Sequence, residues 1–182
     1  IMIGFILLVI LLLGHLALDQ IVLNGILSKT EQITDVEDRL DLLSEQVIGY
    51  DGILTTQIYT ALLHAQYEDW KAVSDHKTKY DQIGIKLDDL LKRDAKILIE
   101  RSERSQKDKE ETEVLLKNID TDNVNLVDLE TRAFTALDKH DLKTATSLVV
   151  GGDYDIYKDK LSEHYLEWSA KEHELTLIAR KT

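Results

Sequence analysis

Apolar positions recur along most of this chain with the period of an α-helix. From residue 33 to residue 54 they follow each other at alternating steps of three and four, the spacing of the buried seam in a packed helical bundle. Further helical stripes occupy residues 70–91, 115–136 and 154–178, and in the third of these four stripes Asp122 stands where an apolar residue is expected. No segment shows the signals of a β-strand. The first seam consists of Ile33, Val36, Leu40, Leu43, Val47, Tyr50 and Leu54.

Polar segments between the stripes predict where the helices end. A tight reversal is expected at residues 64–69, with Trp70 opening the second helix. Residues 100–113 contain no apolar residue, and we interpret them as the bend into the third helix, with Ser105 as its N-cap. A short helix from Leu142 should stop at the Gly151–Gly152 pair, and the last helix should start at Asp153. The predicted fold is therefore all-α, an antiparallel four-helix bundle.

Residues 1–18 form an almost unbroken apolar run, IMIGFILLVILLLGHLAL, which passes into the first helix without proline. A bilayer core of about 30 Å needs roughly 20 apolar helical residues. We therefore predict a transmembrane helix at residues 1–23, continuous with the long first helix of a sensor domain at residues 24–182. The alternatives are a cleaved signal peptide, which would begin with basic residues, and a buried core helix, which the remaining chain is not apolar enough to surround. Few basic residues follow the run, which favours an extracytoplasmic domain on a cell-membrane protein with a single N-terminal span.

Composition narrows the function further. The chain has 182 residues with no proline and no cysteine, which favours long uninterrupted helices and excludes disulfides and thiolate metal sites. The net charge is −12, and nucleic-acid binding, which needs a basic surface, is not expected. Solubility is the simplest reason for the acidity. Adjacent acids such as Asp88 and Asp89 point to different sides of a helix and are expected to be solvated.

The residue types needed for metal binding or catalysis are not in suitable patterns. None of the six histidines has Asp or Glu three positions before it, as a di-iron bundle site requires. No catalytic triad, phosphate-binding loop or Gly-rich fingerprint occurs. We therefore expect no metal, no cofactor and no enzymatic activity in this region.

Three stretches carry a resemblance to a known family. They are Tyr50-Asp-Gly-Ile-Leu-Thr-Thr56 followed by Asp69-Trp70 and Tyr80, then Leu129-Glu-Thr-Arg-Ala-Phe134, then Asp141-Leu-Lys-Thr-Ala145 leading to Asp153-Tyr154 and Lys158. With these motifs, residues 49–168 resemble the all-helical extracytoplasmic sensor domains of prokaryotic transmembrane histidine kinases and chemotaxis receptors. Gly151-Gly152 replaces the Ser-Pro that this family often has. The resemblance implies a stimulus-sensing module whose output lies in a cytoplasmic region outside this chain.

The regular seam breaks after Leu54, and this break is the candidate ligand site. Strict heptad spacing would bury Gln57 and His64, whereas Ile58 and Ala65 follow a frame shifted by one residue. Such a phase change loosens packing, and a small polar ligand could bind between this segment and the facing helices. The alternative is that the aromatic rings only pack between helices, with their hydroxyl groups at the rim. The candidate ligand-binding residues are Thr55, Thr56, Tyr59, Trp70, Tyr80, Arg132, Tyr154 and Tyr157.

These observations favour the sensor domain of a membrane-bound signal-transduction protein such as a histidine kinase or chemoreceptor. It is expected to form a parallel homodimer through its first helix and to transmit a ligand-induced shift of helices. The alternative is a membrane-anchored coiled-coil tether or adaptor that binds a protein partner without a small ligand. The sequence after Thr182 would separate them, because a second apolar span and a transmitter region would indicate signalling.

Overall fold

The computed structural model describes residues 36–181, and this region consists of helices and turns without strands. The all-α prediction is therefore confirmed for the described residues. In chain order the elements are α2 (Val36–Gln66), α3 (Trp70–Asp89), the π-helical turn η1 (Leu90–Asp94), α4 (Ala95–Arg101), α5 (Gln106–Asp138), α6 (Leu142–Val149) and α7 (Asp153–Ala179).

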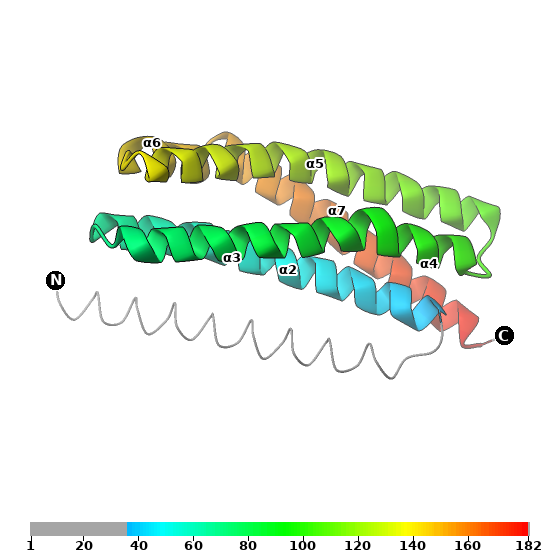
Figure 1. The fold of residues 1–182 in the computed structure, drawn as a ribbon. Coiled ribbons are helices and arrows are strands. Elements are labelled where there is room, and N and C mark those ends of the chain that lie inside the picture. Colours follow the sequence, from blue (N-terminus) through cyan, green and yellow to red (C-terminus); the bar gives the residue numbers. More distant parts are fainter. Residues whose placement is uncertain (1–35, 182) are drawn as a thin grey trace, which may run out of the picture.

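The long helices lie side by side along one direction (Figure 1). The chain runs along α2, returns along α3, η1 and α4 as one rod, runs back along α5, and returns again along α7. α2 packs mainly against α3 and α7, while α5 packs mainly against α7 and α6. The start of α2 and the end of α7 therefore lie at the same end of the described structure.

The helix boundaries follow from capping residues that the sequence places at the predicted positions. The side chains of Asp69, Ser105 and Asp141 accept hydrogen bonds from backbone N–H groups at the starts of α3, α5 and α6, at 3.2, 3.2 and 3.0 Å. Gly151 and Gly152 have φ angles of +79° and +59°, which a residue with a side chain rarely adopts. The predicted reversal and glycine stop are confirmed. The predicted bend at residues 100–113 is confirmed only in part, because the chain turns at residues 102–105 and residues 106–113 already belong to α5.

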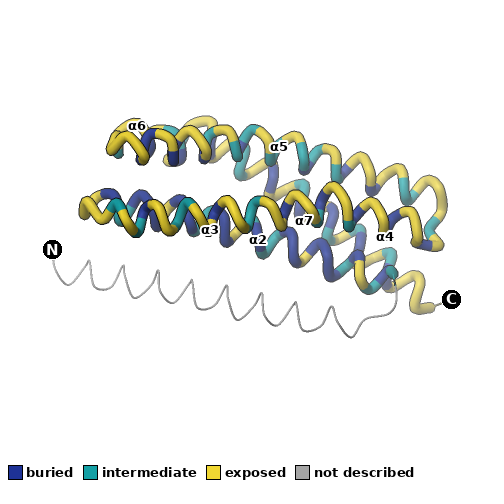
Figure 2. The backbone as a smooth tube through the Cα atoms, in the orientation of Figure 1, coloured by how far each residue is buried: buried dark blue, intermediate teal, exposed yellow. Residues whose placement is uncertain are grey.

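Figure 2 shows by colour that the buried residues lie on the inward faces of the helices, and most of these buried residues are apolar. The seam of α2 is buried from Leu40 to Leu54, with Val36 half-buried; Ile33 lies outside the described residues. Past Leu54 both frames are buried, since Gln57 is 4% and Ile58 0% exposed. The phase change in the sequence pattern therefore leaves residues of both frames in the core of α2.

The π-helical turn η1 was not predicted from the sequence. The backbone N–H of Ala95 donates to the carbonyl oxygen of Leu90, five residues earlier. Before this turn the buried residues of the rod are Val73, Tyr80 and Leu87, spaced by seven; after it, burial continues with Ala95 and Leu98. Such a turn adds one residue to the helix and changes which side of the rod faces the core.

The predicted location of the chain needs correction. The predicted transmembrane helix at residues 1–23, and the domain boundary that follows it, lie outside the described residues. Within residues 36–181, every helix is too short or too polar to cross a bilayer. α5 has sufficient length, 33 residues, but starts with the polar sequence QKDKEETE. The prediction of a cell-membrane protein with a single N-terminal span and an extracytoplasmic domain is contradicted by this finding.

Candidate functional site

A buried carboxyl group, that of Glu130 on α5, joins three helices. Glu130 is 1% exposed. Its Oε1 accepts a hydrogen bond of 2.8 Å from the Tyr154 hydroxyl on α7, and its Oε2 accepts one from the Tyr80 hydroxyl on α3. A buried carboxylate is costly unless it is paired or hydrogen-bonded. The two tyrosines supply those bonds, so α3, α5 and α7 share one polar contact.

An ion pair connects α2 to the same region. Lys158 Nζ on α7 lies 2.8 and 2.6 Å from the two carboxylate oxygens of Asp51 on α2. The side chains of Lys158 and Asp51 are 19% and 13% exposed, so water screens the pair only partly. Lys158 is one helical turn after Tyr154, which places both on one side of α7. We call Asp51, Tyr80, Glu130, Tyr154 and Lys158 the Glu130 cluster.

Burial dominates the electrostatics of this cluster. It raises the pKa of Glu130 above its ordinary value of 4.5, while the hydrogen bonds from Tyr80 and Tyr154 and the charge of Lys158 act in the opposite direction. Burial and the charge of Glu130 raise the pKa of both tyrosines far above the usual range, so both remain neutral donors. Gain or loss of one proton on Glu130 would therefore change the hydrogen bonds that hold three helices together.

Two further tyrosines lie next to the cluster. The Tyr59 ring meets the Tyr154 ring edge to face, with centroids 6.3 Å apart and planes at 83°, and its hydroxyl donates to the Val149 carbonyl at 3.2 Å. Tyr59 is 39% exposed, so it connects the cluster with the surface near the end of α6. The hydroxyl of Tyr165 on α7 is buried and has no hydrogen-bond partner among the described residues. Burial, together with the charges of Asp51 and Glu130, raises its pKa.

Three of the eight sequence-predicted site residues, namely Tyr59, Tyr80 and Tyr154, come together at this cluster. The two threonines instead bond to their own helix. Thr55 Oγ1 donates to the Asp51 carbonyl at 3.0 Å, and Thr56 Oγ1 donates to the Gly52 carbonyl at 2.9 Å. Such bonds are common for threonine inside helices and occupy the hydroxyl hydrogen.

The structure places the remaining predicted residues differently. Trp70 stacks on His140, with ring centroids 3.9 Å apart and planes at 7°, next to the α2–α3 turn. Arg132 is exposed and pairs with Asp128 on its own helix at 3.0 Å. Tyr157 is half-buried and packs against the apolar core. The structure does not bring Trp70 or Arg132 to the Glu130 cluster.

Glu130, Asp51 and Lys158 were not predicted as site residues from the sequence, although a signal was present for Glu130. Glu130 lies four residues after Leu126 and three before Ala133, and both of these are buried. A charged residue on the apolar side of a predicted helix indicates a buried polar group. Asp122 gives the same signal, and its Oδ2 lies 2.7 Å from Nδ1 of His164 on α7.

A second buried ion cluster holds the other end of the structure. Arg104, in the turn before α5, forms two parallel hydrogen bonds of 3.0 and 2.5 Å with Glu172 on α7, and one of 2.6 Å with Glu37 on α2. Trp168 Nε1 also donates to Glu172, at 3.1 Å. Burial opposes the charge of Arg104, but the bonds to Glu172 and Glu37 outweigh it and raise its pKa. This cluster fixes the ends of α2 and α7 to each other.

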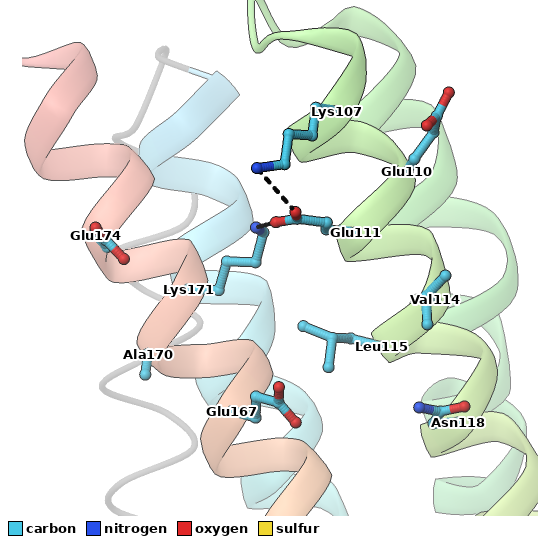
Figure 3. Close-up of a pocket in the computed structure, with 10 residues that line it drawn as sticks. All are labelled: Lys107, Glu110, Glu111, Val114, Leu115, Asn118, Glu167, Ala170, Lys171 and Glu174. Carbon is cyan, nitrogen blue, oxygen red and sulfur yellow. Dashed lines mark hydrogen bonds and ion pairs between the residues drawn. The ribbon is translucent and has the colours of Figure 1, made fainter.

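A groove of about 780 Å³ lies between α5 and α7, away from Glu130 (Figure 3). Lys171 on α7 points across it to Glu111 on α5, and Lys107 reaches the same carboxylate from the preceding turn of α5. The lining on α5 ends at Asn118, about 18 Å along the helix from Glu130 at 1.5 Å per residue. Glu111 and Lys107 are solvent-exposed, and exposed ion pairs contribute little energy. This groove therefore gives no chemistry comparable to the Glu130 cluster.

Within residues 36–181, no three His, Cys, Asp or Glu side chains are arranged so that they could hold a metal ion. Comparisons of this chain with protein-family models, with curated proteins and with solved structures find no match.

Proposed function

We propose that this chain is the sensor module of a signal-transduction protein such as a histidine kinase or chemoreceptor. In this proposal the described helices form an antiparallel four-helix bundle, and a small ligand is sensed through the Glu130 cluster. The observation that carries the proposal is the buried Glu130 carboxyl group, which accepts hydrogen bonds from Tyr80 on α3 and Tyr154 on α7.

In this proposal the Glu130 cluster is the element that changes between two arrangements. The buried Glu130 carboxyl group is stable only while both tyrosine hydroxyls donate hydrogen bonds to it. A ligand that forms a hydrogen bond with one of these hydroxyls in place of Glu130 therefore makes the present helix arrangement less stable. A ligand can shift a protein between two arrangements only if it interacts differently with each. The Asp51–Lys158 ion pair would carry such a shift from α7 to α2.

A second candidate function is a helical tether or adaptor that binds a protein partner. The observation that favours it is that the Glu130 carboxyl has both oxygens hydrogen-bonded within the protein. Buried polar groups of this kind can serve only to fix the register of packed helices. In that case small ligands would leave the cluster unchanged.

We also propose a parallel homodimer formed through the first helix. Leu40 and Leu43 are 0% and 5% exposed, so replacing them by Asp would unfold the protomer and could not report on association alone. Sedimentation of the unaltered chain over a range of concentrations is the direct test, and a monomer at every concentration would exclude the dimer.

The sensor proposal is tested by ligand-dependent thermal unfolding of the chain. The probes are a panel of amino acids, short carboxylic acids and short amines, applied to the wild type, to Glu130→Gln and to Glu163→Gln, which makes the same change at an exposed position of α7. A ligand of the folded state raises the midpoint temperature. We expect at least one probe to stabilise the wild type and Glu163→Gln but not Glu130→Gln. Absence of any stabilising probe, or equal stabilisation of all three proteins, would overturn the proposal and favour the tether.

A further inference from the structure

A groove of about 420 Å³ between the α3–η1 rod and α5 extends down to Tyr80. Tyr80 and Leu54 line the groove and are 5% and 3% exposed, so its floor belongs to the core. The volume lies within the range of small-molecule sites in proteins. The same Tyr80 donates its hydroxyl hydrogen to Glu130, so this groove adjoins the Glu130 cluster.

The walls of the groove are mainly apolar, and some of that apolar surface is open to solvent. Ile85 on α3 is 67% exposed and Val124 on α5 is 58% exposed, and both line the groove. Gly84 lies between Tyr80 and the acidic end of the groove, and a Cβ atom added there would meet no atom within 4 Å. The missing side chain at Gly84 therefore leaves space on this wall.

One end of the groove is negatively charged. Asp88, Asp89 and Asp120 line it together with Lys92, so three carboxylates face one ammonium group in the lining. Lys92 Nζ lies 2.6 Å from Asp88 and 3.7 Å from Asp120, while Asp89 pairs with Arg93 at 3.7 Å. The sequence predicted Asp88 and Asp89 to be solvated, because neighbouring residues diverge on a helix. In the structure, Asp120 on α5 lines the same end of the groove as Asp88 and Asp89 on α3.

The backbone is irregular at this end. Lys92 belongs to the π-helical turn η1, and single π-helical turns inside α-helices often occur at functional sites. An apolar wall, a negatively charged end and a floor formed by Tyr80 together fit a ligand with an apolar body and a positive head.

We propose that this groove binds a small amphipathic cation, a primary amine with a short apolar body. The apolar body lies over Leu54 and Tyr80, and the ammonium group lies between Asp88 and Asp120, where Lys92 now bridges. This inference rests on the proposed sensor function, because Tyr80 would report occupancy of the groove to Glu130.

The test uses n-hexylammonium as the probe, with hexanol and hexanoate as ligands of similar shape and different charge. Binding to the full chain is followed by chemical shifts in ¹H–¹⁵N NMR spectra and by calorimetry. We expect saturable binding of hexylammonium, at least tenfold weaker binding of hexanol, and no binding of hexanoate. Equal affinity for all three compounds would overturn the assignment of a cation site.

Substitutions at Gly84 locate the site without weakening the fold. Gly84→Leu should fill the groove and weaken hexylammonium binding at least tenfold, whereas Gly84→Ala adds one methyl group and should bind like the wild type. Leu and Ala both favour helix more than Gly does, so neither variant should unfold more readily. Asp120→Asn should weaken the amine but not hexanol. Unchanged amine binding by Gly84→Leu would show that the site lies elsewhere.

The outcomes separate this inference from the proposed function. If hexylammonium binds as expected but the resonances of Tyr80 and Glu130 do not shift, the groove is a binding site and the sensing role fails. If hexylammonium does not bind, while another compound stabilises the protein in a Glu130-dependent manner, the sensor proposal holds and the amine site is wrong. If Gly84→Leu changes sedimentation instead of amine binding, the groove is a contact between copies of the chain, and the amine site is also wrong.

Discussion

Removing the hydroxyl group of Tyr154 should destabilise the protein well beyond the usual effect of a Tyr→Phe change. Tyr154 is 1% exposed, and its hydroxyl donates to Glu130 Oε1 at 2.8 Å. Hydrogen bonds to charged groups contribute about 1.5–3 kcal/mol, and a buried acceptor that loses its donor costs a similar amount. The ring and its packing stay in place in Tyr154→Phe, so little cavity energy is added. We expect a loss of about 2 kcal/mol in the free energy of unfolding.

The measurement is urea unfolding at neutral pH, followed by helical circular dichroism, with Tyr157→Phe as the control. Tyr157 is on the same helix and half-buried, and its substitution should cost less than about 0.5 kcal/mol. In Glu130→Gln the acceptor is uncharged, so adding Tyr154→Phe to that variant should cost less than it does in the wild type, by about 1 kcal/mol.

Two results would refute this reasoning. The first is a loss for Tyr154→Phe no larger than that for Tyr157→Phe, which would mean that the Tyr154 bond contributes nothing. The second is full additivity with Glu130→Gln, since residues that share a hydrogen bond should show a coupling energy.

Three further predictions concern other regions of the structure. Because burial raises the pKa of Glu130 above 4.5 in the folded state, this carboxyl group holds its proton more strongly in the folded protein than in the unfolded chain, and its contribution to stability should fall as pH rises from about 4.5 to the raised pKa. Glu130→Gln should remove this contribution, so the difference in unfolding free energy between wild type and Glu130→Gln should vary with pH over that range in urea unfolding. Arg104→Ala leaves the Glu172 carboxylate buried without its cation and should cost about 3–5 kcal/mol, whereas Arg132→Ala breaks an exposed pair and should cost under about 1 kcal/mol. Equal losses would contradict the difference in burial. Gly84→Ala should raise the free energy of unfolding by about 0.5–1 kcal/mol, because the added methyl group meets open space inside a helix, and a decrease in the thermal midpoint would show that the space is not open.

The helix ends could be predicted because they depend on nearby residues. Asp69, Ser105 and Asp141 each bond to a backbone group three residues later. The Gly151–Gly152 stop likewise depends only on local backbone freedom. Interactions between residues this close in the chain can be recognised from a single sequence.

The candidate site depends on which sides of three helices, far apart in the sequence, are packed against each other. The sequence indicates these sides only in part. Glu130 and its two partners are separated by 50 and 24 positions along the chain. Arg132 was predicted as a site residue, but at about 100° per residue it lies roughly 200° around α5 from Glu130, on the exposed side. The π-helical turn η1 also changes which side of the α3–α4 rod is buried. No residue type in the sequence indicates where such a turn occurs.

The buried ion cluster of Arg104, Glu37 and Glu172 also determines how this protein would respond to mechanical load. Arg104 holds Glu37 near the start of α2 and Glu172 near the end of α7, and Thr176 Oγ1 donates to the Glu37 carbonyl at 3.0 Å. Tension that pulls these two helix ends away from each other would therefore act first on this cluster. The two helices would then separate one contact after another from this end. The contacts along the helices would not all bear the load at the same time. The force needed for this first step would be set by the bonds that Arg104 makes with Glu37 and Glu172.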